Sequence, residues 1–186
     1  MRQDSRNTNE WVSIMRKDIF KHIGREFYEK CVLSAVLLTF FTFLPKVGYE
    51  NGDTENIGAH VAYMFCHVNI WHLAGNLFVL WIVRGKLYVV PSLLIAFLAS
   101  LIPAFSIWGD VGVTMGFSGV LFAMWGVKWG IYCHRKYGMD FTLSSYREFL
   151  LKAVPFALIG ILIPHLNWCI HLYSLLAGFV YGRFRR

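Results

Sequence analysis

Six stretches of mainly apolar residues, separated by short polar segments, run along this chain. They cover residues 28–44, 62–83, 87–107, 115–133, 149–163 and 168–182. A helix needs about 20 apolar residues to cross a bilayer, and tilt or local thinning accommodates the shorter stretches. The pattern predicts an all-α membrane protein whose six transmembrane helices form one bundle.

The overall composition supports this interpretation. Of the 186 residues, 56% are hydrophobic and only 16% are charged. A soluble domain needs more polar surface than this, whereas a bilayer accepts apolar surface provided that backbone groups bond one another inside helices. The composition therefore argues against an ordinary soluble domain and predicts that the lipid bilayer is the solvent of the bundle.

The basic residues gather on one side of this arrangement. If the N-terminus is cytoplasmic, all 18 Lys and Arg residues except Lys46 fall in cytoplasmic segments, and the outer loops hold Glu50, Asp53, Glu55 and Asp110. This distribution satisfies the positive-inside rule and predicts that both termini are cytoplasmic. Topology thus explains the net charge of +7, and we expect no nucleic-acid partner.

Residues 1–27 form a predicted cytoplasmic N-terminal segment, and residues 28–186 form the predicted six-helix core. The N-terminal segment lacks the apolar region of a cleavable signal peptide, so we expect the first span to be an uncleaved anchor. Apolar residues recur there at every fourth position, among basic ones, at Trp11, Met15, Ile19 and Ile23. This spacing fits either an amphipathic helix on an anionic membrane surface or a short solvated helix that leads into the first span.

Four polar side chains lie near the beginnings of the second, fourth and sixth stretches. His72 and Asn76 are four residues apart and therefore share one helix face. Ser118 belongs to a Gly-Phe-Ser-Gly sequence at residues 116–119, and His171 opens the sixth stretch. Each of these residues alone is more often a packing feature of a membrane helix. Because all three stretches run from outside to inside, the four residues share one depth in the outer half of the bilayer, which indicates a site.

Small residues follow both Ser118 and His171 at helical spacing. They are Gly119, Ala123, Gly126 and Gly130 in the fourth stretch, and Ser174, Gly178 and Gly182 in the sixth. Faces of small residues allow two helix backbones to approach closely. If these two faces contact each other, Ser118 and His171 come to the same end of one helix pair. Plain helix packing is the alternative explanation of the spacing.

The chemistry that these residues can carry is acyl transfer by an activated serine. His171 would take the proton of Ser118 and later protonate the leaving amine. His72, Asn76 and the backbone N–H of Ser118 would bind the developing oxyanion, and Gly119 would keep that corner uncrowded. These stretches hold no Asp or Glu to orient His171, so we predict a dyad rather than a triad.

Neither a metal nor a cofactor is expected. The histidines of these stretches lack a neighbouring carboxylate ligand and a His-Glu-x-x-His motif, so a metal-dependent hydrolase is the weakest alternative. The four cysteines form no C-x-x-C pair. Cys66 and Cys169 both lie near the predicted outer face, where a disulfide and two buried thiols are both compatible with the sequence, and buried thiols are favoured.

The motifs and their order resemble the rhomboid family of intramembrane serine proteases. The resemblance covers the core from about Cys31 onward. It rests on the His72-x-x-x-Asn76 pair, the Gly-Phe-Ser118-Gly sequence, and His171 with its small-residue ladder. It implies that Ser118 is the nucleophile, His171 the base, and His72 and Asn76 the oxyanion-hole residues. It also implies that the substrates are single-span membrane proteins, cleaved near the outer face at helix-destabilising residues.

The resemblance assigns supporting roles to Gly116, Gly119, Phe122 and His67 as well. His67 matches a histidine that is structural in the family, and Phe122 occupies a position that is often Tyr but could still stack on His171. A Trp-Arg pair common in the first outer loop of the family is absent here, and Ser174 replaces a ladder glycine. The fifth stretch and the loop at residues 164–167 are expected to form the lateral gate and lid.

Two other function classes compete with the protease. A rhomboid-like protein that binds transmembrane clients without cutting them would normally have lost Ser118 or His171. A transporter or channel would spread ionisable residues through the bilayer, whereas here the polar groups cluster on one side. The compact chain without a targeting extension favours a bacterial inner membrane as its location. Nothing in the sequence indicates an oligomeric state.

Overall fold

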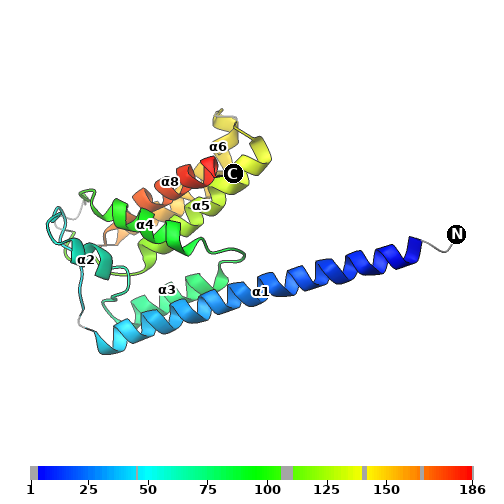
Figure 1. Cartoon of the computed structure of the whole chain (residues 1–186). Helices are drawn as coiled ribbons and strands as arrows, with labels where there is room; N and C mark the ends of the chain where they lie inside the picture. The colour runs from blue at the N-terminus through cyan, green and yellow to red at the C-terminus, as the bar shows by residue number, and fades with distance from the viewer. Residues whose placement is uncertain (1–3, 45, 106–110, 140–141, 164–165, 186) are drawn as a thin grey trace.

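The computed structural model describes residues 4–44, 46–105, 111–139, 142–163 and 166–185, with side chains from residue 24 onward except that of Ser145. All regular elements of the described chain are helices, and one isolated β-bridge pairs Tyr49 with Thr114. The helices form a bundle from which the N-terminal part of the first helix extends (Figure 1). The all-α class predicted from the sequence is therefore confirmed.

The first apolar stretch belongs to one 40-residue helix, α1 (Asp4–Phe43). This helix continues without a break through residue 27, where we expected the boundary between the N-terminal segment and the core. α1 runs beside α3 (Ile70–Ile82) (Figure 1). The Lys30 ammonium joins the two helices, since it pairs with Glu26 at 2.8 Å and donates to the carbonyl of Trp81 at 3.1 Å. The side chains of the predicted amphipathic face at residues 11–23 lie outside the described ones.

The second apolar stretch does not form one helix, which corrects our prediction for residues 62–83. The chain forms α2 (Ile57–Ala62), then a turn, and α3 starts only at Ile70. The reason is Asn69, whose backbone is extended and whose side chain accepts the N–H of His72 at 2.9 Å. An asparagine in this position caps a helix and competes with its continuation toward the N-terminus.

The third stretch contains α4 (Val89–Ser100), which is shorter than the predicted span. The fifth stretch, predicted as one span over residues 149–163, is also divided. It comprises the end of α6 (Leu143–Lys152), then α7 (Val154–Leu158) and the 3-10 helix η1 (Ile159–Leu162). Pro155 stands in the first turn of α7, where its missing N–H is tolerated, and it cannot continue the preceding helix.

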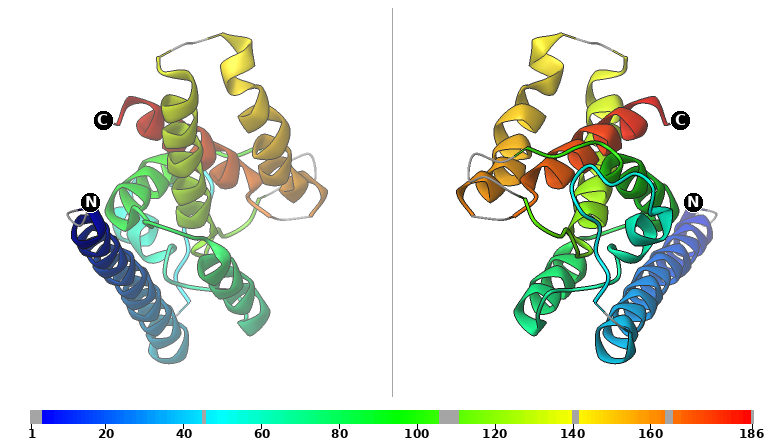
Figure 2. Two further views of the ribbon diagram at one scale, coloured as in Figure 1. Left: turned by 90° about the vertical axis from the view of Figure 1, so that its right-hand side faces the viewer. Right: turned by 90° about the vertical axis from the view of Figure 1, so that its left-hand side faces the viewer.

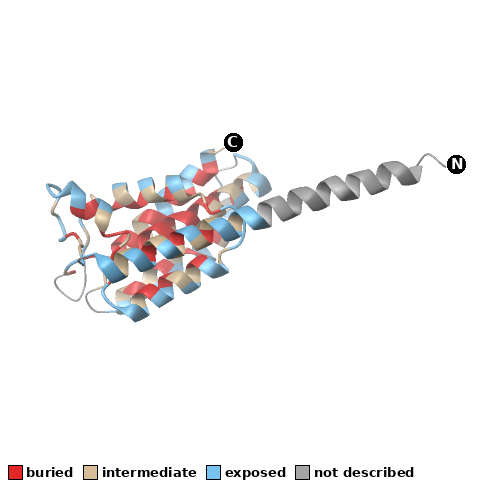
Figure 3. Ribbon diagram, turned by 60° about the horizontal axis from the view of Figure 1, so that its bottom comes forward, coloured by how far each residue is buried: buried red, intermediate tan, exposed pale blue. Residues whose placement is uncertain are grey.

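The fourth and sixth stretches form α5 (Ser118–Tyr137) and α8 (Trp168–Phe184), which pack together at the centre of the bundle (Figure 2). The predicted contact between their small-residue faces is confirmed. A methyl group on Gly126 would meet the backbone of Leu175 and Phe179, and one on Gly178 would meet the backbone of Ala123. Buried residues gather between the helices, and the outward faces are exposed (Figure 3).

Many of the outward-facing side chains are large and apolar. Phe78 on α3 is 66% exposed, and Val90 and Leu94 on α4 are 77% and 59% exposed. Within the described residues, no helix combines the length and the apolarity needed to cross a membrane. The number of spans and the cytoplasmic position of both termini stay predictions.

Candidate active site

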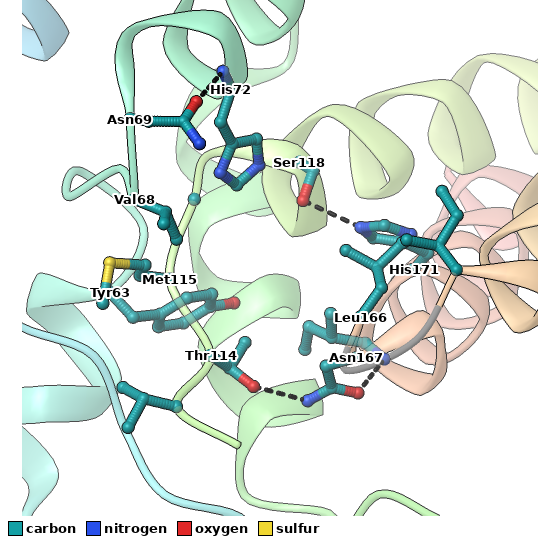
Figure 4. Close-up of a pocket in the computed structure, with 14 residues that line it drawn as sticks. Tyr63, Val68, Asn69, His72, Thr114, Met115, Ser118, Leu166, Asn167 and His171 are labelled. Carbon is teal, nitrogen blue, oxygen red and sulfur yellow. Dashed lines mark hydrogen bonds between the residues drawn. The ribbon is translucent and has the colours of Figure 1, made fainter. Parts of the chain in front are cut away.

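Ser118 and His171 meet where the central helices α5 and α8 begin. The Ser118 hydroxyl and the Nε2 atom of His171 are 2.8 Å apart and share a hydrogen bond (Figure 4). Ser118 is the first residue of α5, and His171 lies in the first turn of α8. The close approach of the two helices along their small residues therefore brings together a serine and a histidine that are 53 positions apart in the chain.

The segment before Ser118 is shaped by Gly116. Its φ of +133° is a conformation that side-chain-bearing residues rarely adopt, and a methyl group there would lie 2.5 Å from Cε1 of His72. Its N–H donates to the carbonyl of Tyr63 at 2.8 Å. The absence of a side chain at Gly116 is thus what allows the His72 ring to lie beside the Ser118 turn.

His67 supports the same turn. Its Nδ1 lies 3.2 Å from the carbonyl of Phe65, and its Nε2 accepts the N–H of Phe117 at 3.4 Å. A carbonyl can only accept, so the ring proton must be on Nδ1. His67 therefore contacts the backbone of the residue just before Ser118, and its ring packs edge-on against that of His72 at 5.3 Å.

Asn167 fixes the start of α8 and was missed as a site residue in the sequence. Its carbonyl oxygen accepts the N–H of Ile170 at 3.2 Å, and its amide donates to Thr114 Oγ1 at 2.9 Å and to the Tyr49 hydroxyl at 3.2 Å. It thus ties the turn that carries His171 to the segment that leads to Ser118 (Figure 4). The signal was available, because an Asn just before a predicted helix is a typical N-cap.

Two cavities meet at Ser118. The first, which we call the loop-side cavity, has a volume of about 370 Å³ and is lined by Ser118, His171, His72 and the loop residues on either side (Figure 4). The second, which we call the lateral groove, has a volume of about 830 Å³ and runs from Ser118 and Asn76 along α5. Ser118 lines both, so a group can approach its hydroxyl from two directions.

The two predicted oxyanion residues therefore lie in different spaces. His72 borders the loop-side cavity, and Asn76 borders the lateral groove one helical turn further along α3. Asn76 is 5% exposed, and its amide nitrogen has no hydrogen-bond partner among the described residues. A buried amide without a partner is costly, and it is a donor available to a group that enters the site.

Phe122 and Gly119 define the walls around the Ser118–His171 pair. The Phe122 ring stacks on the His171 ring, with centroids 4.5 Å apart and planes inclined by 20°. A methyl group on Gly119 would lie 3.1 Å from the Tyr63 hydroxyl and 3.2 Å from Ile170, closer than side chains normally pack. The stacking holds the imidazole of His171 toward Ser118, and no carboxylate within the described residues hydrogen-bonds this ring.

Comparison with known proteins identifies the relatives of this chain. The family model of the rhomboid domain matches residues 54–186, which is well over half of the sequence. The chain belongs to the rhomboid family. Membership implies an integral membrane protein of a family that typically consists of intramembrane serine proteases acting on transmembrane substrates. Neither the curated proteins nor the solved structures give a match to this chain.

This rhomboid protein contains a second Ser–His pair, which provides an internal comparison. Ser100 Oγ lies 2.8 Å from Nδ1 of His60, the same separation as in the Ser118–His171 pair. Ser100 is 3% and His60 1% exposed, the other ring nitrogen of His60 donates to the carbonyl of Asp53, and neither residue borders either cavity. Two features distinguish the Ser118 pair: Ser118 borders both cavities, whereas the Ser100 hydroxyl is buried and donates to the carbonyl of Phe97 at 2.6 Å.

Neither a metal-binding cluster nor a disulfide is found among the described residues of this rhomboid chain. The described residues contain no group of three His, Cys, Asp or Glu side chains that could hold a metal ion. Cys66 and Cys169 are both buried, and each is a thiol rather than half of a disulfide. The Cys169 thiol donates to the carbonyl of Phe105 at 3.4 Å, and this bond helps to seat the first turn of α8.

Proposed function

We propose that this chain is an intramembrane serine endopeptidase in which Ser118 is the nucleophile and His171 its general base. The observation that carries the proposal is the 2.8 Å hydrogen bond between Ser118 Oγ and His171 Nε2, located where two cavities meet. A serine hydroxyl is a weak nucleophile until a neighbouring base accepts its proton, and this separation suits that transfer.

The reaction that follows is acyl transfer in two steps. Ser118 Oγ bonds to the carbonyl carbon of the scissile peptide while its proton passes to Nε2 of His171. The carbon–nitrogen bond then breaks, and His171 gives this proton to the leaving amine. Water attacks the resulting ester with His171 again as base, which releases the new carboxyl end and restores the Ser118 hydroxyl.

Three donors support stabilisation of the oxyanion intermediate. Ser118 is the first residue of α5, so its backbone N–H has no partner within that helix and lies at the positive end of the helix dipole. The unpartnered amide of Asn76 and the ring of His72 flank the same serine. Donors that are held in place before the charge develops typically contribute about 3–4 kcal/mol each to such a barrier.

The substrates that we propose are transmembrane segments of single-span membrane proteins. A hydrogen-bonded helix hides its carbonyl groups, so a cleavable segment must unwind at the scissile bond. The lateral groove supports entry from the side of the bundle, since it is open between α3 and α7 and reaches Ser118. The one-sided distribution of Lys and Arg supports a position of the site toward the outer side of the membrane.

The experiment that tests this proposal is labelling of the purified full-length protein by a fluorescent fluorophosphonate. We expect the wild type to be labelled, and we expect Ser118→Ala and His171→Ala to lose labelling by at least a factor of about 100. The matched control is Ser100→Ala, which removes the other histidine-bonded serine and should be labelled like the wild type.

Two results would contradict the proposal. Equal labelling of the wild type and Ser118→Ala would mean that the reactive serine lies elsewhere. A folded wild type that stays unlabelled in both detergent and lipid vesicles would favour a protein that binds transmembrane clients without cutting them.

A further inference from the structure

The lateral groove changes character along its length. At its Ser118 end it is lined by apolar and aromatic side chains, including Phe122, Trp125 and Phe156. At its other end it is lined by the charged residues Arg84, Lys128, Lys152 and Glu148. α5 contributes more of the lining residues than any other helix, and α3, α6 and α7 contribute the rest together with the loop that follows α3.

The charges at this end are not balanced within the described chain. Glu148 is already paired with Lys136 at 2.5 Å and with Lys152 at 3.7 Å. Arg84 and Lys128 form no ion pair within 4 Å of a described carboxylate. Glu26 attracts Lys128 at longer range, but this carboxylate is already paired with Lys30 at 2.8 Å. The Lys128 ammonium donates to the backbone carbonyl of Arg84, which uses one of its three N–H groups.

The position of these cations relative to Ser118 follows from helix geometry. Lys128 is ten residues after Ser118 on the same continuous helix, so the two side chains are separated by about 15 Å along the α5 axis. A helical substrate that lies parallel to α5 covers this distance in about ten residues. If roughly three residues at the scissile bond are extended, at about 3.3 Å each, about six residues suffice.

We propose that the lateral groove selects transmembrane substrates that carry a carboxylate about six to ten residues from the scissile bond, where Arg84 and Lys128 can pair with it. This inference rests on the proposed function, since it takes Ser118 as the point of cleavage. A carboxylate in an apolar segment is costly in the bilayer, and two cations without a close carboxylate partner compensate it. A lysine at the same substrate position meets like charge and is rejected.

The groove favours a peptide over an anionic phospholipid as the occupant because it is continuous with the nucleophile. A headgroup bound by Arg84 and Lys128 would place an acyl chain along the aromatic wall toward Ser118. An acyl chain has no acceptor for the unpartnered amide of Asn76. A peptide supplies both the backbone carbonyl for Asn76 and the carboxylate for the cations. The experiment must therefore distinguish a peptide occupant from an anionic phospholipid.

The test measures binding and cleavage of three single-span peptides that differ at one position only. The position lies eight residues from the intended scissile bond and carries Glu, Gln or Lys. Binding is measured on full-length Ser118→Ala protein in phosphatidylcholine vesicles, by energy transfer from tryptophan to a dansyl group on the peptide, because Trp125 and Trp129 line the groove. Cleavage of the same peptides is measured on the wild type. We expect the Glu peptide to bind and to be cleaved about tenfold better than the Lys peptide.

The charge variants identify the residues responsible. Arg84→Gln combined with Lys128→Gln should bring the ratio between the Glu and Lys peptides to about one. The matched control is Lys86→Gln, which neutralises a cation in the same loop that does not line the groove and should leave the tenfold ratio intact. A ratio that persists in the double variant would overturn the assignment.

Three further outcomes are decisive. Equal binding of the three peptides to Ser118→Ala would refute charge selection even if the wild type cleaves them all. Preserved discrimination in binding without cleavage or fluorophosphonate labelling would support the groove as a carboxylate site and would refute the protease instead. If the peptides bind equally but phosphatidylglycerol slows labelling of the wild type and not of the double variant, the occupant is an anionic lipid and the peptide proposal fails.

Discussion

Gly126 is the position at which the contact between α5 and α8 can be tested most directly. A methyl group added there would press against the carbonyl oxygen of Leu175 and would lie 2.8 Å from the amide nitrogen of Phe179, whereas ordinary contacts begin at 3.4 Å. Both neighbours are backbone atoms of α8 and cannot rotate away. The two helices must therefore separate by on the order of 1 Å in Gly126→Ala.

The effect on stability combines two opposing contributions. Overpacking of a tight contact costs up to about 3 kcal/mol, and replacement of a helical glycine by alanine returns about 1 kcal/mol. We expect a net loss of about 2 kcal/mol in the free energy of unfolding. The effect on reactivity is larger, because the Ser118–His171 hydrogen bond of 2.8 Å does not survive a separation of about 1 Å. A displacement of this size typically lowers a rate about 100-fold.

The assay is the rate constant of fluorophosphonate labelling, measured beside thermal unfolding followed by circular dichroism. The matched control is Gly75→Ala, because a methyl group on Gly75 in α3 meets no atom within 4 Å and should be neutral or slightly stabilising. If Gly126→Ala is labelled within twofold of the wild-type rate and unfolds at the same temperature, the close helix contact does not hold the serine and histidine together and the reasoning is wrong.

Two further predictions concern the turns that carry the site. Gly116→Ala should lower the labelling rate at least about tenfold and destabilise the fold by about 1–3 kcal/mol, because it combines backbone strain with a clash against His72. At Gly112 the φ is also positive, but an added methyl group would meet no described atom within 4 Å. Gly112→Ala should therefore lose stability without a comparable loss of labelling. Asn167→Ala should destabilise by about 2–4 kcal/mol in thermal unfolding, since it removes a helix cap and two buried side-chain bonds, whereas Asn167→Asp keeps the cap and should lose less. Equal unfolding temperatures for both Asn167 variants would contradict the role of the cap.

The parts of the fold that the sequence predicted are those in which one periodic signal dominates. α8 begins at Trp168, as its apolar stretch does, and the spacing of Gly126 and Gly178 correctly predicted which faces of α5 and α8 touch. Close packing of backbones requires small residues at helical intervals, and few other features produce that spacing. For this reason the meeting of Ser118 and His171 could be predicted without a structure.

The parts that the sequence did not predict depend on local competition or on distant partners. Hydrophobicity continues through residues 62–83, yet the side chain of Asn69 ends the helix by bonding the His72 N–H. Pro155 divides the fifth stretch for a different local reason, since it has no N–H with which to continue the preceding helix. The Asn167 cluster joins residues 49, 114 and 167, and no periodic pattern links such positions.

The two Ser–His pairs differ in access to the serine, which a sequence motif does not reveal. Ser100–His60 and Ser118–His171 have the same 2.8 Å separation, so this distance alone cannot assign a nucleophile. Hydrolysis of a membrane-embedded peptide needs two separate routes to the serine, one for water and one for the substrate. Ser118 borders both the loop-side cavity and the lateral groove, whereas Ser100 borders neither. The first turn of α5 lies between these two spaces. On one side Gly116 makes room for His72, which lines the loop-side cavity, and on the other side Asn76 lines the lateral groove. The neighbouring residues therefore determine that the serine lies between the two routes.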